Sequence, residues 1–175
     1  QIRKDFETHM QSKIQDMWSK KLGLSQHNHQ VCERLLELFG LSKVDYTIFF
    51  RELSHLPNNF FALKKSFYES LPEQLETQWT SWFDQWYQLI TQKNDQRIVS
   101  QSMLATNPKY TWREWLIVPA YEQASRGDYS LIHQIQAVLN HPYEEQTQAI
   151  KDEYYRLRPE SYIYAGGISH YSCSS

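Results

Sequence analysis

The stretch from Ser70 to Ile90 restricts the possible folds of this chain more than any other part of it. Its large apolar residues recur at steps of three and four, at Leu75, Trp79, Trp82, Phe83, Trp86, Leu89 and Ile90. This spacing puts all of them on one face of an α-helix, whereas a strand would turn neighbouring positions to opposite faces. An aromatic stripe of this kind is typical of a packed core. The stretch therefore predicts a long helix whose aromatic face is buried among other helices.

The rest of the chain shows the same helical periodicity between regularly placed breaks. Apolar residues at helical spacing predict further helices at residues 2–22, 25–40, 42–53, 59–69, 98–104, 111–126, 130–139 and 144–157. Glycine or proline stands at most of the breaks. No segment alternates convincingly as a strand would. We therefore expect an all-α fold of about eight helices in antiparallel pairs, with residues 1–160 as a helical domain and residues 161–175 as an irregular tail.

Three capping signals predict where helices begin. Residues 70–73 and 111–114 are capping boxes, in which a hydroxyl side chain accepts from a helical N–H and a glutamate reaches back to the cap. Ser25 is expected to cap the second helix. Pro108 lacks an N–H and must interrupt the preceding helix at Asn107. A new helix is therefore expected to start soon after it.

Composition predicts a globular chain and argues against several partners. The 175 residues are 41% hydrophobic and 15% aromatic, which predicts a real core despite a mean hydropathy of -0.68. A net charge of -2 and the lack of long Lys/Arg runs argue against nucleic acid or an anionic membrane as partner. No apolar run approaches the ~18 residues of a membrane span, and the first residues lack a signal peptide's apolar region. The chain begins inside a predicted helix, which is typical of a fragment.

The cysteines and the paired histidines predict no metal site. Cys32 and Cys173 have no metal-ligand spacing and no disulfide framework, which is typical of a reducing compartment. We expect a cytoplasmic protein in a bacterium, or a mitochondrial one in a eukaryote. Cys32 lies on an apolar helix face and is expected to be buried. His27 and His29 are expected to be solvated loop residues.

The common catalytic motifs are absent from the sequence. It contains no GxGxxG, no Walker loop, no HExxH, no nucleophile elbow and no CxxC. It also lacks the His-Arg-Asp and Asp-Phe-Gly motifs that kinases use for catalysis and metal binding. We therefore predict no catalytic, cofactor-binding or metal-binding residue in this chain.

Several blocks of the sequence resemble one protein family. They are KKLGL at 20–24, KVDYTIFFRELS at 43–54, NPKYTWREWL at 107–116, ASRGDYSLIHQI at 124–135, NHPYEEQ at 140–146 and SCSS at 172–175. The family that they resemble is selenoprotein O, the kinase-like protein adenylyltransferases. We single out a structural motif in the third block, made of Asn107, Pro108, Thr111, Arg113 and Glu114. The family usually has asparagine where this chain has Glu114.

The resemblance implies that this chain is roughly the C-terminal third of a protein with a kinase-like, or pseudokinase, fold. In that family ATP is held in reverse, so that a Ser, Thr or Tyr hydroxyl of a protein substrate attacks the α-phosphate and AMP is transferred. ATP and Mg²⁺ are implied for the intact protein and no cofactor for this chain. The catalytic residues are expected upstream. The expected partner of this chain is that upstream kinase-like part of the same polypeptide, which it would support.

The resemblance also singles out Cys173, because the family carries a cysteine or selenocysteine third from its C-terminus. It implies redox regulation, and we expect Cys173 to pair with a cysteine in the upstream part. A thiol in a tail of small residues is accessible, but access alone does not lower its pKa. An inert terminal thiol is the alternative. Arg113 is a further candidate, for holding the chain against the upstream part.

Two departures from the family concern the last helices. Pro119 stands where the family helix continues, and a proline inside a helix costs ~3 kcal/mol or bends it. The segment RPESYIYAGG replaces a Pro-Pro-Asp-Trp segment of the family.

A second hypothesis is a free-standing helical module that binds a protein partner through aromatic-rich surfaces, without catalysis. The two hypotheses differ in one structural expectation. A fragment of a larger protein should expose a contiguous apolar patch larger than the ~300 to 600 Å² typical of monomers, where the missing part packs.

Overall fold

The computed structural model describes residues 2–92 and 95–162, with side chains from residue 6 onward. The regular elements in these ranges are all helices, which confirms the predicted all-α fold. Their bounds are α1 (Ile2–Leu22), α2 (His29–Leu41), α3 (Tyr46–Leu53), η1 (Phe60–Ser66), α4 (Glu73–Thr91), α5 (Gln96–Thr106), α6 (Glu114–Ala124), α7 (Ser130–Leu139), α8 (Gln148–Tyr154) and η2 (Glu160–Tyr162). Within the described part of the chain, no helix is both long and apolar enough to cross a membrane.

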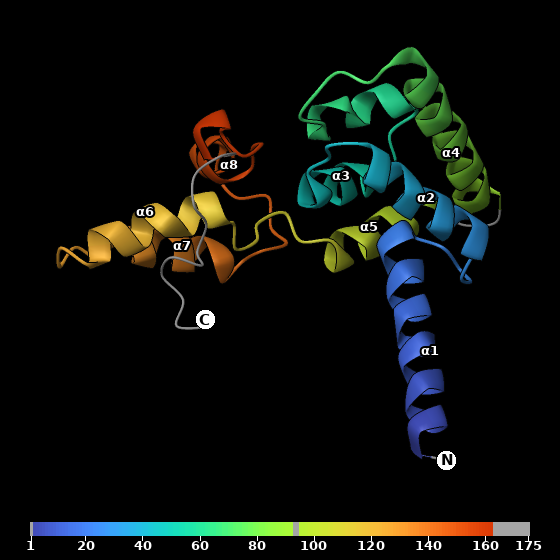
Figure 1. Cartoon of the computed structure of the whole chain (residues 1–175), viewed down its shortest axis with the longest axis horizontal. Helices are drawn as coiled ribbons and strands as arrows, with labels where there is room; N and C mark the ends of the chain where they lie inside the picture. The colour runs from blue at the N-terminus through green and yellow to red at the C-terminus, as the bar shows by residue number, and fades with distance from the viewer. Residues whose placement is uncertain (1, 93–94, 163–175) are drawn as a thin grey trace. The chain divides into compact units, whose positions relative to one another are not determined.

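The chain forms two compact units, Gln1–Asn107 and Pro108–Ser175. The first unit holds α1 to α5, with the 3₁₀ helix η1 between α3 and α4, and the second holds α6 to α8 and η2 (Figure 1). The boundary falls at the Asn107-Pro108 dipeptide, where the missing N–H of proline stops the helix. The division into a domain of residues 1–160 and a tail of residues 161–175 stays a prediction.

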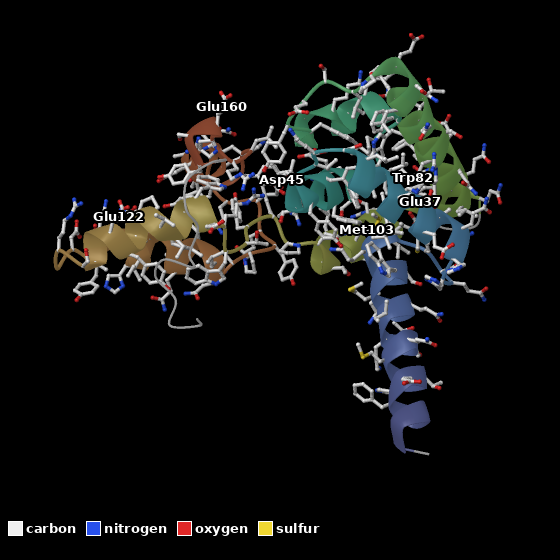
Figure 2. All side chains as sticks on the ribbon, in the orientation of Figure 1. Glu37, Asp45, Trp82, Met103, Glu122 and Glu160 are labelled. Carbon is white, nitrogen blue, oxygen red and sulfur yellow. The ribbon has the colours of Figure 1, made fainter. Side chains whose placement is uncertain are left out.

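The core of the first unit is built around the tryptophans of α4. Trp79, Trp82 and Trp86 are buried, as the aromatic stripe predicted. Trp82 lies between α4 and α2, where its indole N–H donates to the carbonyl of Val31 at 3.0 Å (Figure 2). The indole N–H of Trp86 donates to the carbonyl of Leu22 at 2.8 Å. Because a buried N–H without an acceptor costs free energy, these bonds fix α4 against α2 and α1.

Leu89 of α4 and Ile98 of α5 are among the predicted apolar residues that lie outside the core. Leu89 is 37% exposed and Ile98 is 64% exposed. The core residues of α5 are Met103, which the predicted apolar face includes, and Val99, which it does not, and α5 packs against α1. Helical spacing alone could not choose between neighbouring faces of so short a helix.

Gly23 ends α1, as predicted, and allows α5 to approach closely. Its φ is +66°, a left-handed backbone conformation that residues other than glycine rarely adopt. A Cβ at this position would lie 2.6 Å from the side chains of both Val99 and Met103. Glycine is therefore required here for its backbone conformation and for space.

The predicted N-caps of α4 and α2 are wrong by two and three residues, respectively. α4 begins at Glu73 with Pro72 as its N-cap and no side-chain cap hydrogen bond, so the box at 70–73 does not form. A proline disfavours the helical conformation in the residue before it, which keeps the chain extended up to Pro72. The side chain of Asn28, and not that of Ser25, caps α2 by accepting from the third helical N–H.

The second unit is built on an antiparallel pair of helices, α6 and α7 (Figure 1). Gly127, with φ of +88°, lies in the turn between them. The small core of the second unit consists of Tyr110, Ala120, Ile135, Val138 and Tyr154. α6 continues through Pro119. α8 is shorter than the predicted range of 144–157 and is capped by Thr147, whose hydroxyl accepts from the N–H of Ile150.

Candidate functional site

Three of the blocks that resemble selenoprotein O meet in the first unit. Their meeting point is a polar cluster, which we define as Lys21, Arg51, Ser54 and Asn107. Lys21 lies at the end of α1, Arg51 and Ser54 at the end of α3, and Asn107 directly after α5. All of them except Lys21 are fully or almost fully buried. Buried polar groups are costly unless they are hydrogen-bonded, so the bonds inside this cluster decide what it does.

Asn107 joins the three helix ends through its side-chain amide. Its Nδ2 donates to the carbonyl of Lys21 at 2.9 Å and to Oγ of Ser54 at 3.0 Å. Its Oδ1 accepts from Nζ of Lys21 at 2.9 Å. Both donors of the amide and its carbonyl oxygen are thus used, which fixes the orientation of the side chain. One residue therefore holds the ends of α1, α3 and α5 together.

Arg51 bonds to the carbonyl end of α5. Its Nη1 donates to the carbonyl of Leu104 at 3.0 Å and to the carbonyl of Asn107 at 3.1 Å. The last carbonyls of a helix have no partner within the helix and carry the negative end of its dipole. A guanidinium is well suited to this position, because it supplies several donors and a positive charge. Arg51 is 2% exposed, and this use of its donors is consistent with its burial.

Lys21 lies over aromatic rings at the edge of the cluster. Its Nζ is 4.3 Å from the centroid of the Phe50 ring and 5.1 Å from that of Tyr46. Desolvation lowers the pKa of Lys21 and raises that of Tyr46. The ring faces attract the ammonium group and partly replace the water that it loses.

A second polar cluster, formed by Lys109, Pro142, Glu145 and Tyr155, holds the second unit together. The backbone N–H of Lys109 donates to the carbonyl of Pro142 at 2.7 Å. The buried Nζ of Lys109 pairs with the carboxylate of Glu145 and lies 5.0 Å from the centroid of the Tyr155 ring. The third and fifth blocks of the resemblance, which begin at Asn107 and Asn140, therefore meet here.

The structure shows where each predicted motif residue lies. Asn107 closes the first unit and Pro108 opens the second. The predicted cap at Thr111 is wrong, because α6 begins at Glu114 with an extended Arg113 as N-cap and no side-chain cap hydrogen bond. Nη1 of Arg113 instead donates to the carbonyl of Arg156 at 3.4 Å, which ties the start of α6 to the segment after α8. Cys173 lies outside the described residues.

Sequence reasoning missed Arg51 and Lys109. Arg51 directly follows the buried residues Phe49 and Phe50 on α3. Lys109 lies between a proline and the core residue Tyr110. A charged residue at a position surrounded by core residues is the signal that could have found both. Lys and Arg are rarely buried unless they are paired.

Within the described residues, the side chains of both clusters form structural contacts between distant segments. The side chains of both clusters bond to helix ends, to each other or to backbone carbonyls, as a structural junction would. In the described ranges, no group of three or more His, Cys, Asp or Glu side chains could hold a metal ion. His29 lies in the first turn of α2, where its Nε2 is 3.0 Å from Glu33.

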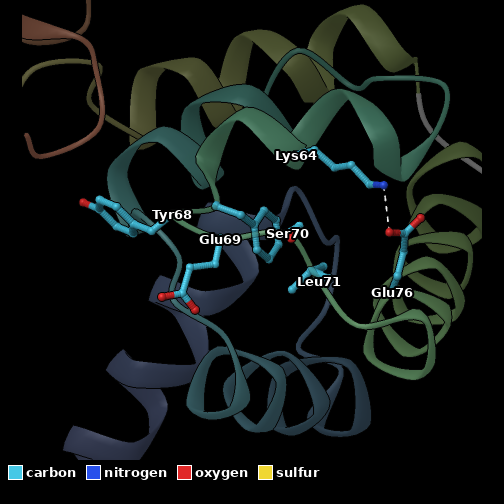
Figure 3. A pocket seen from close by; sticks show the side chains of 7 residues that line it. Lys64, Tyr68, Glu69, Ser70, Leu71 and Glu76 are labelled. Carbon is cyan, nitrogen blue, oxygen red and sulfur yellow. Dashed lines mark hydrogen bonds and ion pairs between the residues drawn. The ribbon is translucent and has the colours of Figure 1, made fainter. Parts of the chain in front are cut away.

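The pocket between η1 and the start of α4 lies at the lower end of the size range of ligand pockets. Its volume is about 280 Å³, and its walls include Lys64, Tyr68, Glu69, Ser70, Leu71 and Glu76 (Figure 3). Ligand pockets in proteins have ~300 to 1,000 Å³. Two of its charges pair with each other, since Nζ of Lys64 is 2.8 Å from the carboxylate of Glu76. We therefore assign no ligand to it.

The described part of the chain is all-α, and its two polar clusters connect segments that are distant in the sequence. The family model described as "Protein adenylyltransferase SelO" matches residues 1–140. Over 163 residues the chain is 33% identical to a protein nucleotidyltransferase YdiU of Stutzerimonas stutzeri, and over 172 residues it is 30% identical to one of Flavobacterium johnsoniae. Each alignment covers 91% of this chain. The chain belongs to the SelO family of protein adenylyltransferases.

The alignments cover only part of the relatives. They take in 32% of the Stutzerimonas protein and 33% of the Flavobacterium protein, so the chain spans about a third of the length of the curated relatives it matches. The family model covers both the first polar cluster and Lys109, and it ends before α8. The likeness therefore assigns the family, and the activity of the whole protein needs a separate argument.

Proposed function

We propose that this chain is the C-terminal helical region of a protein adenylyltransferase, which transfers AMP from ATP to Ser, Thr or Tyr residues of proteins. In this proposal the chain supports a kinase-like catalytic core that lies upstream in the same polypeptide. The core, the protein substrates, ATP and Mg²⁺ belong to the intact protein. The cytoplasmic location expected from the sequence stays a prediction.

The observation that carries this proposal is the position of the polar clusters within the family-like blocks. Lys21 and Asn107 are 86 positions apart and yet bond directly. Blocks that resemble an enzyme family but supply hydrogen bonds between helix ends favour a supporting role over a catalytic one. A catalytic core benefits from such rigid support, because its groups must be held close to their productive geometry.

We infer that the upstream part of the intact protein, and not the described residues, holds ATP and Mg²⁺. Phosphoryl and nucleotidyl chemistry needs a carboxylate on the metal and a cation on the phosphates. In the described part of the chain no cluster of acidic side chains can hold a metal ion, and the two cluster lysines are engaged with Asn107 and Glu145. We therefore place no step of the transfer on these residues.

A paired transfer assay tests the proposal. With ATP labelled at the α-phosphate, Mg²⁺ and a generic protein acceptor, we expect label on protein from the full-length gene product and none from the 175-residue chain. ATP labelled at the γ-phosphate is the control and should label nothing, because AMP and not phosphate is transferred. Transfer by the 175-residue chain alone would contradict the supporting role. If neither polypeptide transferred label, the free-standing interaction module would be favoured.

The two cysteines provide a further prediction, in which Cys32 serves as the internal control for Cys173. Cys32 is 3% exposed, and burial raises the pKa of its thiol to about 11. At pH 8 its thiolate fraction is then about 100-fold below that of a thiol with a pKa of 9. We propose that Cys173 forms a disulfide with an upstream cysteine when oxidised glutathione takes up the two electrons.

In the oxidised full-length protein, alkylation followed by mass spectrometry should therefore find neither cysteine modified. Mild reduction should make Cys173 reactive at once, whereas Cys32 should react only after a denaturant is added. Alkylation of Cys173 before reduction would exclude the disulfide. Rapid alkylation of Cys32 in the native protein would contradict its burial.

A further inference from the structure

Every fourth residue of α1 is apolar from its second turn onward. These residues form a ridge along the helix, made of Phe6, Met10, Ile14, Trp18 and Leu22. At the C-terminal end the ridge enters the core of the first unit, because Leu22 is fully buried and the ring of Trp18 lies 6.1 Å from that of Phe50. Ridges of this kind, at steps of four, are those through which helices commonly pack together.

The same ridge is uncovered at its other end. We define the α1 stripe as Phe6, Met10, Ile14 and Met17, which are 63%, 50%, 44% and 41% exposed. Every residue from 6 to 17 is exposed, and α1 projects from the other helices of the first unit (Figure 1). The uncovered part of α1, residues 6–17, is only about three turns long. Isolated helices shorter than ~12 to 15 residues are marginal in water even with favourable sequences. The α1 stripe is therefore an apolar helix face without a cover in the described chain.

We propose that the α1 stripe docks against an apolar helical face in the part of the polypeptide that the family relatives have beyond this chain. This inference rests on the proposed function. The matched region is 33% of the Flavobacterium relative, so about two thirds of a family polypeptide has no counterpart here. The stripe continues a ridge that already packs between helices, and an i±4 ridge fits the groove of another helix at a crossing angle of about -50°.

A tethered segment is better supported as the occupant than a second copy of this chain. Four side chains on one helix offer little area compared with the ~1,200 to 2,000 Å² that stable complexes bury. A segment of the same polypeptide is present at a high effective concentration, so that a small apolar contact is enough to hold it. The upstream part of the intact protein meets this condition.

Amide hydrogen exchange, read by mass spectrometry over residues 6–17, tests the inference. In the 175-residue chain these amides should exchange almost as fast as in an unstructured peptide, because an uncovered helix end frays. In the full-length gene product they should exchange at least about tenfold more slowly. The variant Met10→Glu with Ile14→Glu should lose this protection in the full-length protein and change little in the 175-residue chain.

A matched variant of the opposite helix face controls for the added charges. Ser12→Glu with Gln15→Glu adds the same two carboxylates about 100° or more away from the stripe, so it should keep the protection. Equal exchange in the two polypeptides would overturn the inference. Protection already present in the 175-residue chain, whether or not it depends on concentration, would also overturn it, since the cover would then be a second copy or this chain itself. AMP transfer is measured on the same wild-type full-length protein. If transfer is absent while residues 6–17 are protected, the proposed function is wrong and the docking of the α1 stripe is not.

Discussion

Replacing Trp79 by alanine is expected to lower the free energy of unfolding of the first unit by about 4 kcal/mol, as for other large buried aromatic residues. The Trp79 ring stacks on that of Phe60 with centroids 5.8 Å apart and meets that of Phe67 edge-on at 5.3 Å. Its indole N–H donates to Oγ of Ser42 at 2.9 Å. Alanine removes all of these contacts and leaves a cavity among bulky rings. Urea unfolding followed by circular dichroism measures the loss.

Two control variants show whether the loss comes from the core. Phe61 lies in the same unit and is 60% exposed, so Phe61→Ala should change the free energy of unfolding by no more than about 0.5 kcal/mol. Trp79→Phe keeps a ring and gives up the N–H donor, so its effect should lie between the other two. It also provides a folded protein to measure if the alanine variant does not fold. Equal, small effects of all three substitutions would show that the aromatic core is not as described.

Replacing Asn107 by alanine is expected to destabilise the first unit by about 3 kcal/mol, because three hydrogen bonds are lost together in a buried place. The fully buried amide donates to the carbonyl of Lys21 and to Oγ of Ser54, and it accepts from Nζ of Lys21. Alanine leaves the carbonyl of Lys21, Oγ of Ser54 and Nζ of Lys21 without the amide as a partner. The same urea unfolding experiment measures the effect.

Asn58→Ala is the matched control, since the same atoms are removed from an exposed position, with an expected effect of no more than about 0.5 kcal/mol. A double-mutant cycle of Asn107→Ala with Ser54→Ala should give a coupling energy above about 0.5 kcal/mol, as for residues that share a hydrogen bond. Strictly additive effects would mean that the amide acts by filling space alone.

Much of the helical architecture could be predicted because it depends on local patterns. The buried face of α4 follows from the spacing of Trp79, Trp82 and Trp86, and Gly23 ends α1 as its conformational freedom predicts. Helix starts were less predictable, since Asn28 and Ser25 are both good caps and only the path of the chain decides between them.

The polar clusters could not be predicted from the sequence, because they depend on contacts between distant segments. Nothing near Arg51 indicates that its guanidinium will bond to the carbonyl of Leu104, which is 53 positions away. The family-like blocks contain the residues of both clusters except Tyr155, but the resemblance does not show which of these residues bond to one another. α1 is the opposite case, since helical spacing predicted the helix while the apolar residues of the α1 stripe lie exposed in the described chain.

The bond between Lys21 and Asn107 has a consequence for the order in which the chain acquires its structure. Asn107 is the last residue of the first unit, and its amide connects to a helix end 86 positions earlier. A contact between such distant residues forms slowly, because the intervening segment must first be brought together. During synthesis on a ribosome, α1, α3 and α5 would remain unjoined at these ends until residue 107 has emerged from the exit tunnel. The first unit can therefore complete this junction only after its whole sequence has been made.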